Sequence, residues 1–348
     1  MASERDRTLR VFLDRLLDGG GVLAAAGLVG DRRRILARGT AGSLRPSGEG
    51  LPESPLFDLA SLSKPWTATV ALRLDDDDRL PLGRQLGELW PEVGASLSRR
   101  TLAELLSHVA GLQAWAPLPL HCVGPAEVPQ LLLSGGLTGA RTGTYSDLGP
   151  MLWALSARRS TGRGLRQLLG ETVLGPLGIA PGECTTRPEV TRTVASPLDN
   201  RRERELAAAQ ELELPATPAP PPGTVQDGNA RFLGGFPGHA GLFATPEVLW
   251  TLGRAWLGTP RGFLPAASRH AALTGPGRWL LGWERRRTRG SGGGALSEEA
   301  FGHTGFTGGS LWIDPESGRI MVLLAHRTAP EVELDPWRRR FHRLAAGF

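Results

Sequence analysis

The two ends of this chain predict strands that pair in one antiparallel sheet, and this pairing limits the possible folds more than any other feature. Near the N-terminus, apolar runs at 22–29 and 35–39 flank Gly30-Asp31, which is a typical hairpin signal. Near the C-terminus, apolar runs at 310–313 and 320–325 flank a turn rich in Asp, Pro, Ser and Gly. Two hairpins this far apart in the sequence predict a sheet built from both chain ends.

The segments around and between these hairpins are predicted to be helical. Apolar residues at helical spacing predict a helix over residues 4–18, and another helix begins near Asp335-Pro336. The fold class is therefore α+β: an antiparallel sheet built from both chain ends and flanked by helices, with a helical subdomain inserted. Five helices separated by Gly and Pro are predicted between the hairpins, at residues 62–74, 101–109, 127–134, 147–159 and 163–172.

The chain is expected to form one domain with two parts. The sheet subdomain is placed at about residues 1–60 and 232–348, and the helical subdomain at about residues 61–231. Sites tend to lie in the cleft between such parts. Two segments depart from the regular pattern: the Pro-rich stretch 201–224 is expected to be an exposed excursion, and 285–294 is expected to be a mobile loop.

The composition argues against several classes of function. The net charge is +5, and the 40 basic residues are scattered without interleaved aromatic residues, so no nucleic-acid partner is expected. Two cysteines supply neither a disulfide framework nor a zinc site by themselves, and no cofactor or metal is expected. The given chain shows neither a transmembrane run nor a signal peptide, which predicts a cytoplasmic protein without a membrane partner.

Lysine is almost missing from the chain. Lys64 is the only lysine among 348 residues, and Tyr145 is the only tyrosine. Arginine serves equally well on a surface, but its side chain cannot be deprotonated within a protein. A solitary lysine is therefore a candidate for a task that needs a titrating amine.

The first candidate motif is Ser61-Leu62-Ser63-Lys64, followed by a proline that predicts a helix start close to Ser61. Residues three apart share a helix face, so the Lys64 amine can reach the Ser61 hydroxyl. A serine becomes nucleophilic when a nearby base takes its proton, and a desolvated lysine can be that base. The alternative is a surface lysine near a helix start.

The second candidate motif is Tyr145-Ser146-Asp147. A phenol can relay a proton between a serine and a leaving group. Alternatively, Ser146 or Asp147 caps the helix that follows and Tyr145 merely packs. The position of the only tyrosine in this motif favours the chemical interpretation.

The third candidate motif, His303-Thr304-Gly305-Phe306, lies in a glycine-rich run just before the strand predicted at 310–313. Glycines beside a strand edge allow a ligand to approach the backbone closely. A histidine there can bind a carboxylate or help to set the charge of the site. The alternative is a glycine-rich turn without a chemical role.

The three motifs, in this order and on this outline, resemble those of the serine beta-lactamase and penicillin-binding-protein superfamily. The likeness is to its class C-like branch, which also holds D-alanyl-D-alanine peptidases and esterases. It spans about residues 10–345 and implies a single beta-lactamase/transpeptidase-like catalytic domain. The family pattern of S-x-x-K, Y-x-N and K-T-G or H-T-G reads here as Ser61-x-x-Lys64, Tyr145-x-Asp147 and His303-Thr304-Gly305.

The resemblance implies a mechanism. Ser61 attacks a carbonyl and forms an acyl-enzyme, with Lys64 and Tyr145 as a coupled base system in which the proton acceptor is left open. The backbone N–H groups of Ser61 and Phe306 form the oxyanion hole. The implied substrate-binding residues are Asp147, His303, Thr304, Gly305 and Phe306.

Two residues depart from the family pattern. Asp147 replaces the usual asparagine, so an amide donor is lost and a negative charge is added that could keep Lys64 protonated. His303 replaces the commoner lysine, and a neutral imidazole attracts a substrate carboxylate less than an ammonium does. Both changes disfavour efficient beta-lactam hydrolysis. The stretch 225–230 also resembles a segment near peptidoglycan-fragment hydrolases, but Gln226 replaces the expected histidine and receives no role.

The expected function is a serine hydrolase that cleaves a small ester or amide. One alternative is a D-alanyl-D-alanine peptidase or amidase that acts on peptidoglycan fragments. The other is a catalytically weak, ligand-binding member of the fold, which the changes at Asp147 and His303 leave open. The expected partner is a small-molecule ester or amide substrate, and the oligomeric state stays open.

Overall fold

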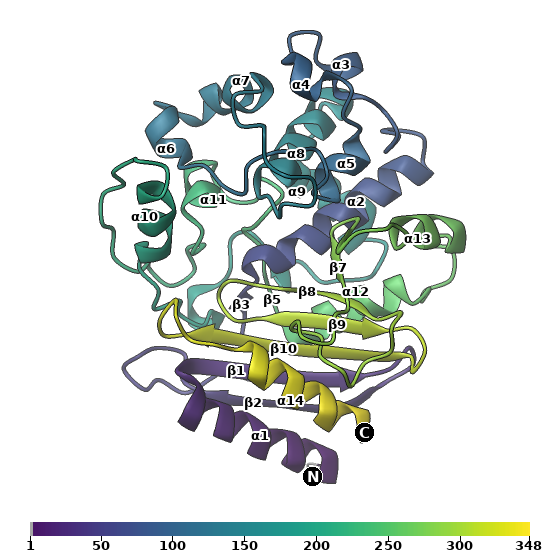
Figure 1. Ribbon diagram of the computed structural model, residues 1–348. Coiled ribbons are helices and arrows are strands. Elements are labelled where there is room, and N and C mark those ends of the chain that lie inside the picture. Colours follow the sequence, from purple (N-terminus) through teal and green to yellow (C-terminus); the bar gives the residue numbers. More distant parts are fainter. Residues whose placement is uncertain (1–2) are drawn as a thin grey trace.

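A seven-stranded antiparallel sheet forms the centre of the computed structural model, which describes residues 3–348 (Figure 1). In this sheet β1 (Val22–Gly30) from the N-terminal hairpin pairs with β10 (Arg319–Arg327) from the C-terminal hairpin. The prediction of a sheet built from both chain ends is therefore confirmed. The strand order is β2-β1-β10-β9-β8-β7-β6, and the other strands are β2 (Ile35–Gly42), β6 (Trp279–Leu280), β7 (Trp283–Arg285), β8 (Phe301–Thr304) and β9 (Ser310–Asp314).

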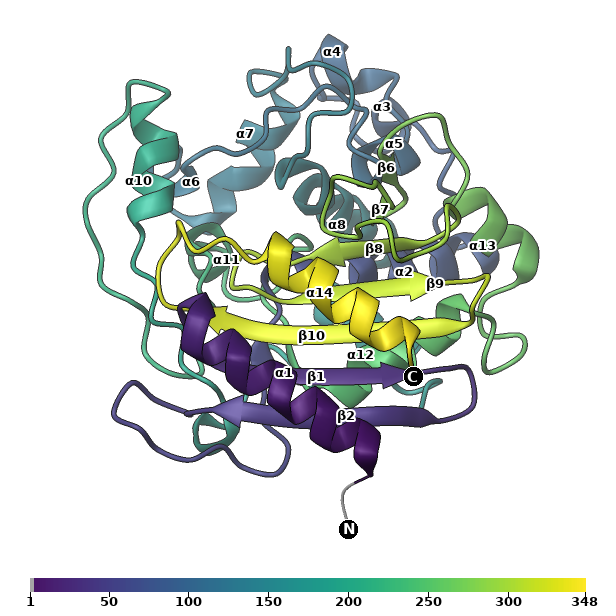
Figure 2. The same cartoon turned by 60° about the horizontal axis from the view of Figure 1, so that its bottom comes forward.

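Helices cover both faces of this sheet. On one face lie α1 (Glu4–Gly20) and α14 (Asp335–Ala346), the two terminal helices (Figure 2). Against the other face packs α12 (Pro246–Trp256), which contacts β1 and β10. Because both faces are covered, β1 is buried along nearly its whole length and reads as one apolar run rather than an alternating pattern.

The five helices predicted between the hairpins are all present, although three of them are shorter than predicted and the other two are shifted by one or two residues. They are α2 (Ser63–Asp76), α5 (Leu102–Leu106), α7 (Val128–Leu133), α8 (Leu148–Thr161) and α9 (Leu165–Leu169). Further helices are α3 (Leu86–Leu89), α4 (Ala95–Ser98), α6 (Leu118–His121), α11 (Gly228–Phe232) and α13 (Ala266–Ala272). Along residues 3–348, every helix is too short or too polar to cross a lipid bilayer.

A small second sheet joins the helical part to the large sheet. Its order is β3-β5-β4, with β3 at Phe57–Asp58, β5 at Phe243–Ala244 and β4 at Cys184–Thr185. Strand β3 leads directly into the segment that carries Ser61, so the small sheet helps to fix the place of the first motif. The proposed boundaries of the two subdomains stay a prediction.

Two irregular segments differ from expectation. The Pro-rich excursion 201–224 is mostly exposed, but it begins with a regular helix, α10 (Arg201–Ala208), whose Ala207 is buried. In the segment 285–294, which was predicted to be a mobile loop, residues 287–289 and 294 are exposed, but residues 290–293 are buried beneath α14. There the Gly292 carbonyl accepts a hydrogen bond from the His342 ring at 2.9 Å. The composition of such a segment predicts that it lacks regular secondary structure. It does not predict whether another element packs against it.

Candidate active site

Ser61 lies in a single 3₁₀ turn, Ala60–Leu62, immediately before α2. The helix start predicted near Ser61 is therefore present. Ala60 has a φ of 45°, a left-handed conformation that is uncommon outside glycine and clusters at functional sites. Its N–H donates to the buried Asp58 carboxylate at 2.8 Å, while the Asp58 N–H donates to Nε2 of His326 at 3.1 Å. These contacts hold the strained turn that presents Ser61.

Lys64 is buried, with 1% of its surface exposed, and its three N–H groups all have acceptors. Nζ donates to Ser61 Oγ at 2.9 Å and to Asp147 Oδ1 at 2.6 Å. The third acceptor is the backbone carbonyl of His239, at 3.2 Å. Burial lowers the pKa of Lys64, but the negative charge of Asp147 and the nearby Tyr145 raise it more, so the net shift is upward. The lysine is thus held as an ammonium ion.

Tyr145 lies against this ammonium, with Lys64 Nζ 4.7 Å from the centre of its ring. Burial raises the pKa of the Tyr145 phenol, and the positive charge of Lys64 lowers it by less, so the phenol is neutral near pH 7. Three other rings surround it, at centroid distances of 4.7 Å for His108, 4.8 Å for Trp279 and 5.9 Å for His303. These rings fix the orientation of the tyrosine.

Hydrogen bonds around Ser146 place the second motif at the start of α8. The Ser146 N–H donates to Nδ1 of His108 at 3.1 Å, and its hydroxyl accepts the Leu148 N–H, also at 3.1 Å. Ser146 thus satisfies the first N–H of α8, whereas Asp147 occupies the N-cap position and its side chain makes no capping hydrogen bond. The two interpretations of this motif are compatible, because Ser146 supports the helix start while Tyr145 and Asp147 contact Lys64.

The third motif lies at the end of β8 and touches the nucleophile segment through its backbone. A Cβ atom on Gly305 would lie 2.5 Å from the Leu59 carbonyl oxygen, so only glycine fits there. The Thr307 hydroxyl donates to the Asp58 carbonyl oxygen at 2.8 Å. The close approach predicted for these glycines therefore serves the neighbouring chain segment. Thr304 forms the last residue of β8, where it pairs with Ser310.

His303 is a buried, neutral imidazole. Its Nδ1–H donates to the Thr304 carbonyl at 2.8 Å, and Nε2 has no hydrogen-bond partner among residues 3–348. Burial, with a smaller effect of the nearby Lys64 charge, lowers the pKa of His303 to about 3. At neutral pH this residue therefore supplies no positive charge for a substrate carboxylate.

A cavity of about 180 Å³ opens beside Ser61. Four of the predicted site residues line it: Ser61, Tyr145, Asp147 and Phe306. The other four, Lys64, His303, Thr304 and Gly305, lie outside the lining. The remaining lining residues are Ala60, Trp115, Arg202, Glu203, Leu206, Gln226, Asp227 and Ala240.

Sequence reasoning missed most of this wall. Arg202, Glu203 and Leu206 come from α10, within the excursion that was expected only to be exposed. Gln226 and Asp227 come from the stretch 225–230, which had a family resemblance but no role. In the sequence, that resemblance was the only sign that residues 225–230 belong to the site, and nothing in α10 indicated a place in the cavity wall.

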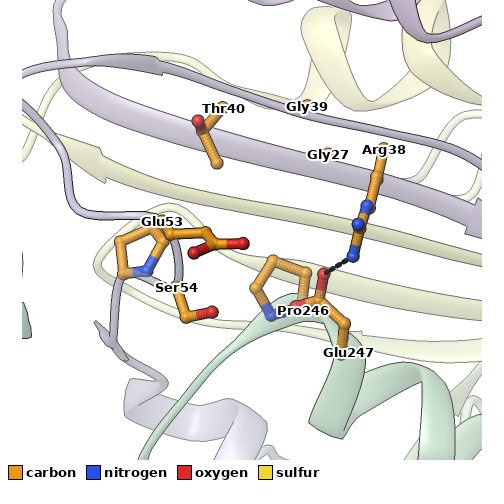
Figure 3. A pocket seen from close by; sticks show the side chains of 9 residues that line it. Gly27, Arg38, Gly39, Thr40, Glu53, Ser54, Pro246 and Glu247 are labelled. Atoms are coloured by element: carbon orange, nitrogen blue, oxygen red, sulfur yellow. Dashed lines mark hydrogen bonds and ion pairs between the residues drawn. The ribbon is translucent and has the colours of Figure 1, made fainter. Parts of the chain in front are cut away.

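A second pocket lies at the edge of the large sheet, between β2 and the start of α12 (Figure 3). Its volume is about 240 Å³, and Arg38 crosses it to reach Glu247, with 3.4 Å between Nη1 and Oε1. The two side chains are 65% and 39% exposed. No lysine, histidine, tyrosine or cysteine lines this pocket. The chemistry described above therefore belongs to the smaller cavity.

Comparisons with known proteins identify the family and the fold of the chain. Residues 9–345 match the protein family described as Beta-lactamase. An Escherichia coli K12 protein named as a provisional D-alanyl-D-alanine carboxypeptidase is 24% identical over 363 aligned positions, which cover 86% of this chain and 77% of that protein.

Solved structures of similar fold cover almost the whole chain. A penicillin-binding protein homologue from Caulobacter crescentus has a TM-score of 0.76 at 21% identity, with 100% of this chain and 98% of that chain covered. A family VIII carboxylesterase has a TM-score of 0.74 at 18% identity, with coverage of 99% and 98%. At these identities the structures support the fold alone.

Proposed function

Because the chain belongs to the beta-lactamase family, we propose that it is a serine hydrolase that cleaves a small ester or amide through an acyl-enzyme on Ser61. The observation that carries this proposal is the 2.9 Å contact between Lys64 Nζ and Ser61 Oγ beside an open cavity. A buried ammonium held at a serine hydroxyl, with a phenol beside it, is a costly arrangement that burial of apolar groups would avoid. Perturbed groups of this kind cluster at functional sites.

The proposed reaction has two halves. Ser61 Oγ attacks the substrate carbonyl, its proton passes to the Lys64–Tyr145 pair, and that pair protonates the departing alcohol or amine. Water then attacks the acyl carbon, gives a proton to the pair and releases the acid, while Ser61 regains its proton. Lys64 already donates three hydrogen bonds and Tyr145 is neutral, so the pair must first lose one proton jointly.

The proposed oxyanion hole uses the backbone N–H groups of Ser61 and Phe306. Both residues line the same cavity, which supports their assignment to one carbonyl oxygen. His303, Thr304 and Gly305 fit a supporting role, since they shape the segment that leads to Phe306 but lie outside the lining. Asp147 is proposed to set the charge of Lys64 at the cavity wall.

A D-alanyl-D-alanine peptidase or amidase is the second candidate, and the name of the Escherichia coli relative favours it. Such a substrate ends in a carboxylate, and the neutral His303 gives that group no ammonium partner. An esterase or amidase for uncharged or cationic substrates therefore fits the site better.

Covalent labelling tests the proposal. The full chain is incubated with a fluorophosphonate probe and with a labelled penicillin, beside the variants Ser61→Ala and Ser54→Ala. Ser54 is a matched control, because it is an exposed serine that lines the second pocket. We expect phosphonate labelling of the parent and of Ser54→Ala, and none of Ser61→Ala.

The outcome also separates the candidates. Stable labelling by penicillin would favour the peptidase, whereas labelling by the phosphonate alone would favour the esterase. If neither probe labels Ser61 while circular dichroism shows folded protein, the hydrolase proposal is wrong and a ligand-binding member of the fold is the better description.

A further inference from the structure

The charges that line the cavity beside Ser61 are unbalanced. Three carboxylates, Asp147, Glu203 and Asp227, face one guanidinium, Arg202. The Arg202 side chain forms an ion pair with Glu205 on the same helix, at 3.0 Å. The lining is therefore acidic even though the whole chain carries a net charge of +5.

Two of the three carboxylates already have partners. Asp147 Oδ1 lies 2.6 Å from Lys64 Nζ, and Asp227 Oδ1 lies 2.9 Å from Nε2 of His239. Glu203 differs, because it forms no ion pair with any cation among residues 3–348. Glu203 is thus the carboxyl group of the lining that has no cationic partner, and a bound cation can supply one.

Glu203 is held at the wall by its contact with the stretch 225–230. Its Oε1 accepts the Gly228 N–H at 2.7 Å. A Cβ atom on Gly228 would lie 2.6 Å from Glu203 Oε2, so glycine allows this close contact. Burial and the nearby Asp227 raise the pKa of Glu203 to about 7, while the hydrogen bond from the Gly228 N–H and the nearby Arg231 and His239 act in the opposite direction by less. A cation in the cavity would favour the ionised carboxylate.

One aromatic residue of the wall suits the same kind of group. Trp115, Tyr145 and Phe306 line the cavity, but Lys64 already lies over the Tyr145 ring and Arg327 over the Phe306 ring. The ring of Trp115 has no such cation in the part of the chain that the structure describes, and aromatic rings attract alkylammonium groups. No free ammonium stands at the third motif, since His303 is neutral. An aromatic ring beside a carboxylate suits a cation, whereas a substrate carboxylate would be repelled by Glu203.

We propose that this site selects esters or amides that carry an ammonium group and lack a carboxylate, and that Glu203 binds the ammonium. The inference rests on the proposed hydrolase function and adds its substrate class. It also gives roles to α10 and to the stretch 225–230, which supply Glu203 and the glycine that seats it.

Matched substrates test the inference on both sides of the scissile bond. For the leaving group, acetylcholine is compared with 3,3-dimethylbutyl acetate, in which a carbon atom replaces the quaternary nitrogen. For the acyl group, the p-nitrophenyl ester of trimethylammoniobutyric acid is compared with its carbon isostere and with the glutaric acid monoester. In at least one of these two comparisons, the kcat/KM of the cationic substrate should be about tenfold or more above that of its neutral isostere. The glutarate should be the poorest substrate.

Two variants test whether Glu203 causes the preference for cationic substrates. Glu203→Gln should reduce the cationic-to-neutral ratio of kcat/KM to about two or less. The control Glu213→Gln removes the same charge from an exposed position of the same segment and should keep the parent ratio. In the parent the ratio should rise as pH increases through about 7 because Glu203 ionises, and Glu203→Gln should remove that rise.

The outcomes distinguish this inference from the proposed function. Ser61-dependent hydrolysis with equal rates for cationic and neutral isosteres would overturn the inference and leave the hydrolase intact. A parent ratio that persists in Glu203→Gln would overturn the role of Glu203. Loss of both phosphonate labelling and hydrolysis would overturn the function, and this inference with it.

Discussion

The Lys64–Asp147 pair beside Ser61 and the Arg38–Glu247 pair in the second pocket have the same formal charges but different surroundings. The side chains of the first pair are 1% and 18% exposed, and those of the second are 65% and 39% exposed. Water surrounds both ions of the exposed pair, so separating them costs little. In the buried pair Lys64 depends on Asp147, because the ammonium cannot recover its hydration without unfolding, whereas Asp147 lies at the cavity wall. Burial, rather than the presence of a pair, indicates where charge has a function.

Removal of the buried ammonium should have the largest effect. We expect Lys64→Met to lower kcat/KM for a neutral ester on the order of 10³-fold, because the base system loses its cation. It should also reduce the free energy of unfolding by about 3 kcal/mol, because Asp147 then stays largely buried without a partner. Ester hydrolysis and urea denaturation measure the two effects.

The double variant Lys64→Met/Asp147→Leu is the control for the stability effect. It removes both charges, so it should be more stable than Lys64→Met although equally inactive. Activity of Lys64→Met within tenfold of the parent would show that Lys64 lies outside the base system.

Removal of only the negative charge should have an intermediate effect. Asp147→Asn restores the residue usual in the family and removes the main charge that raises the pKa of Lys64. Because the pKa of Lys64 is higher in the folded than in the unfolded chain, its protonation stabilises the folded state at every pH below the unfolded pKa of about 10.4. This stabilisation is lost as the pH rises through the pKa of the folded state. Because the Lys64–Tyr145 pair must lose one proton before Ser61 can attack, the rising limb of the pH–rate profile should move to lower pH by at least about one unit. An unmoved limb would contradict the assigned role of Asp147.

Separation of the exposed pair should have the smallest effect. We expect Arg38→Ala and Glu247→Ala each to change the free energy of unfolding by less than about 0.5 kcal/mol, with no change in ester hydrolysis. Urea denaturation of the two single variants and the double variant gives the coupling energy. A coupling above about 1 kcal/mol would show that exposure alone is a poor guide to the strength of ion pairs in this protein.

Local spacing made a large part of the fold and of the candidate site predictable. Ser61 and Lys64 lie within one turn, so their 2.9 Å contact follows from helical geometry. The hairpins at 22–39 and 310–325 were visible as paired apolar runs, and strands β1 and β10 pair as predicted. The bounds of short helices were less accurate: α5 ends at Leu106, and His108 then takes a left-handed conformation that its residue type does not predict.

The sequence alone could not place residues whose roles depend on distant partners. Glu203 lies in a stretch that composition describes only as Pro-rich, and its place in the wall depends on the contact with Gly228. The buried residues 290–293 read as a loose glycine run until α14 packs over them. Such contacts join segments that have no common periodicity, so no local pattern indicates them.

The sequence by itself determined which chemical groups are present and which neighbours share a turn: one lysine, one tyrosine and a serine at helical spacing. The tertiary structure decided their charge states. The charge of Asp147 keeps Lys64 an ammonium against its burial, burial keeps Tyr145 and His303 neutral, and the approach of α10 leaves one carboxyl group without a cationic partner in the cavity. The physical reason is that ionisation depends on solvation and on nearby charges, and both are set by the packing of segments far apart in the chain.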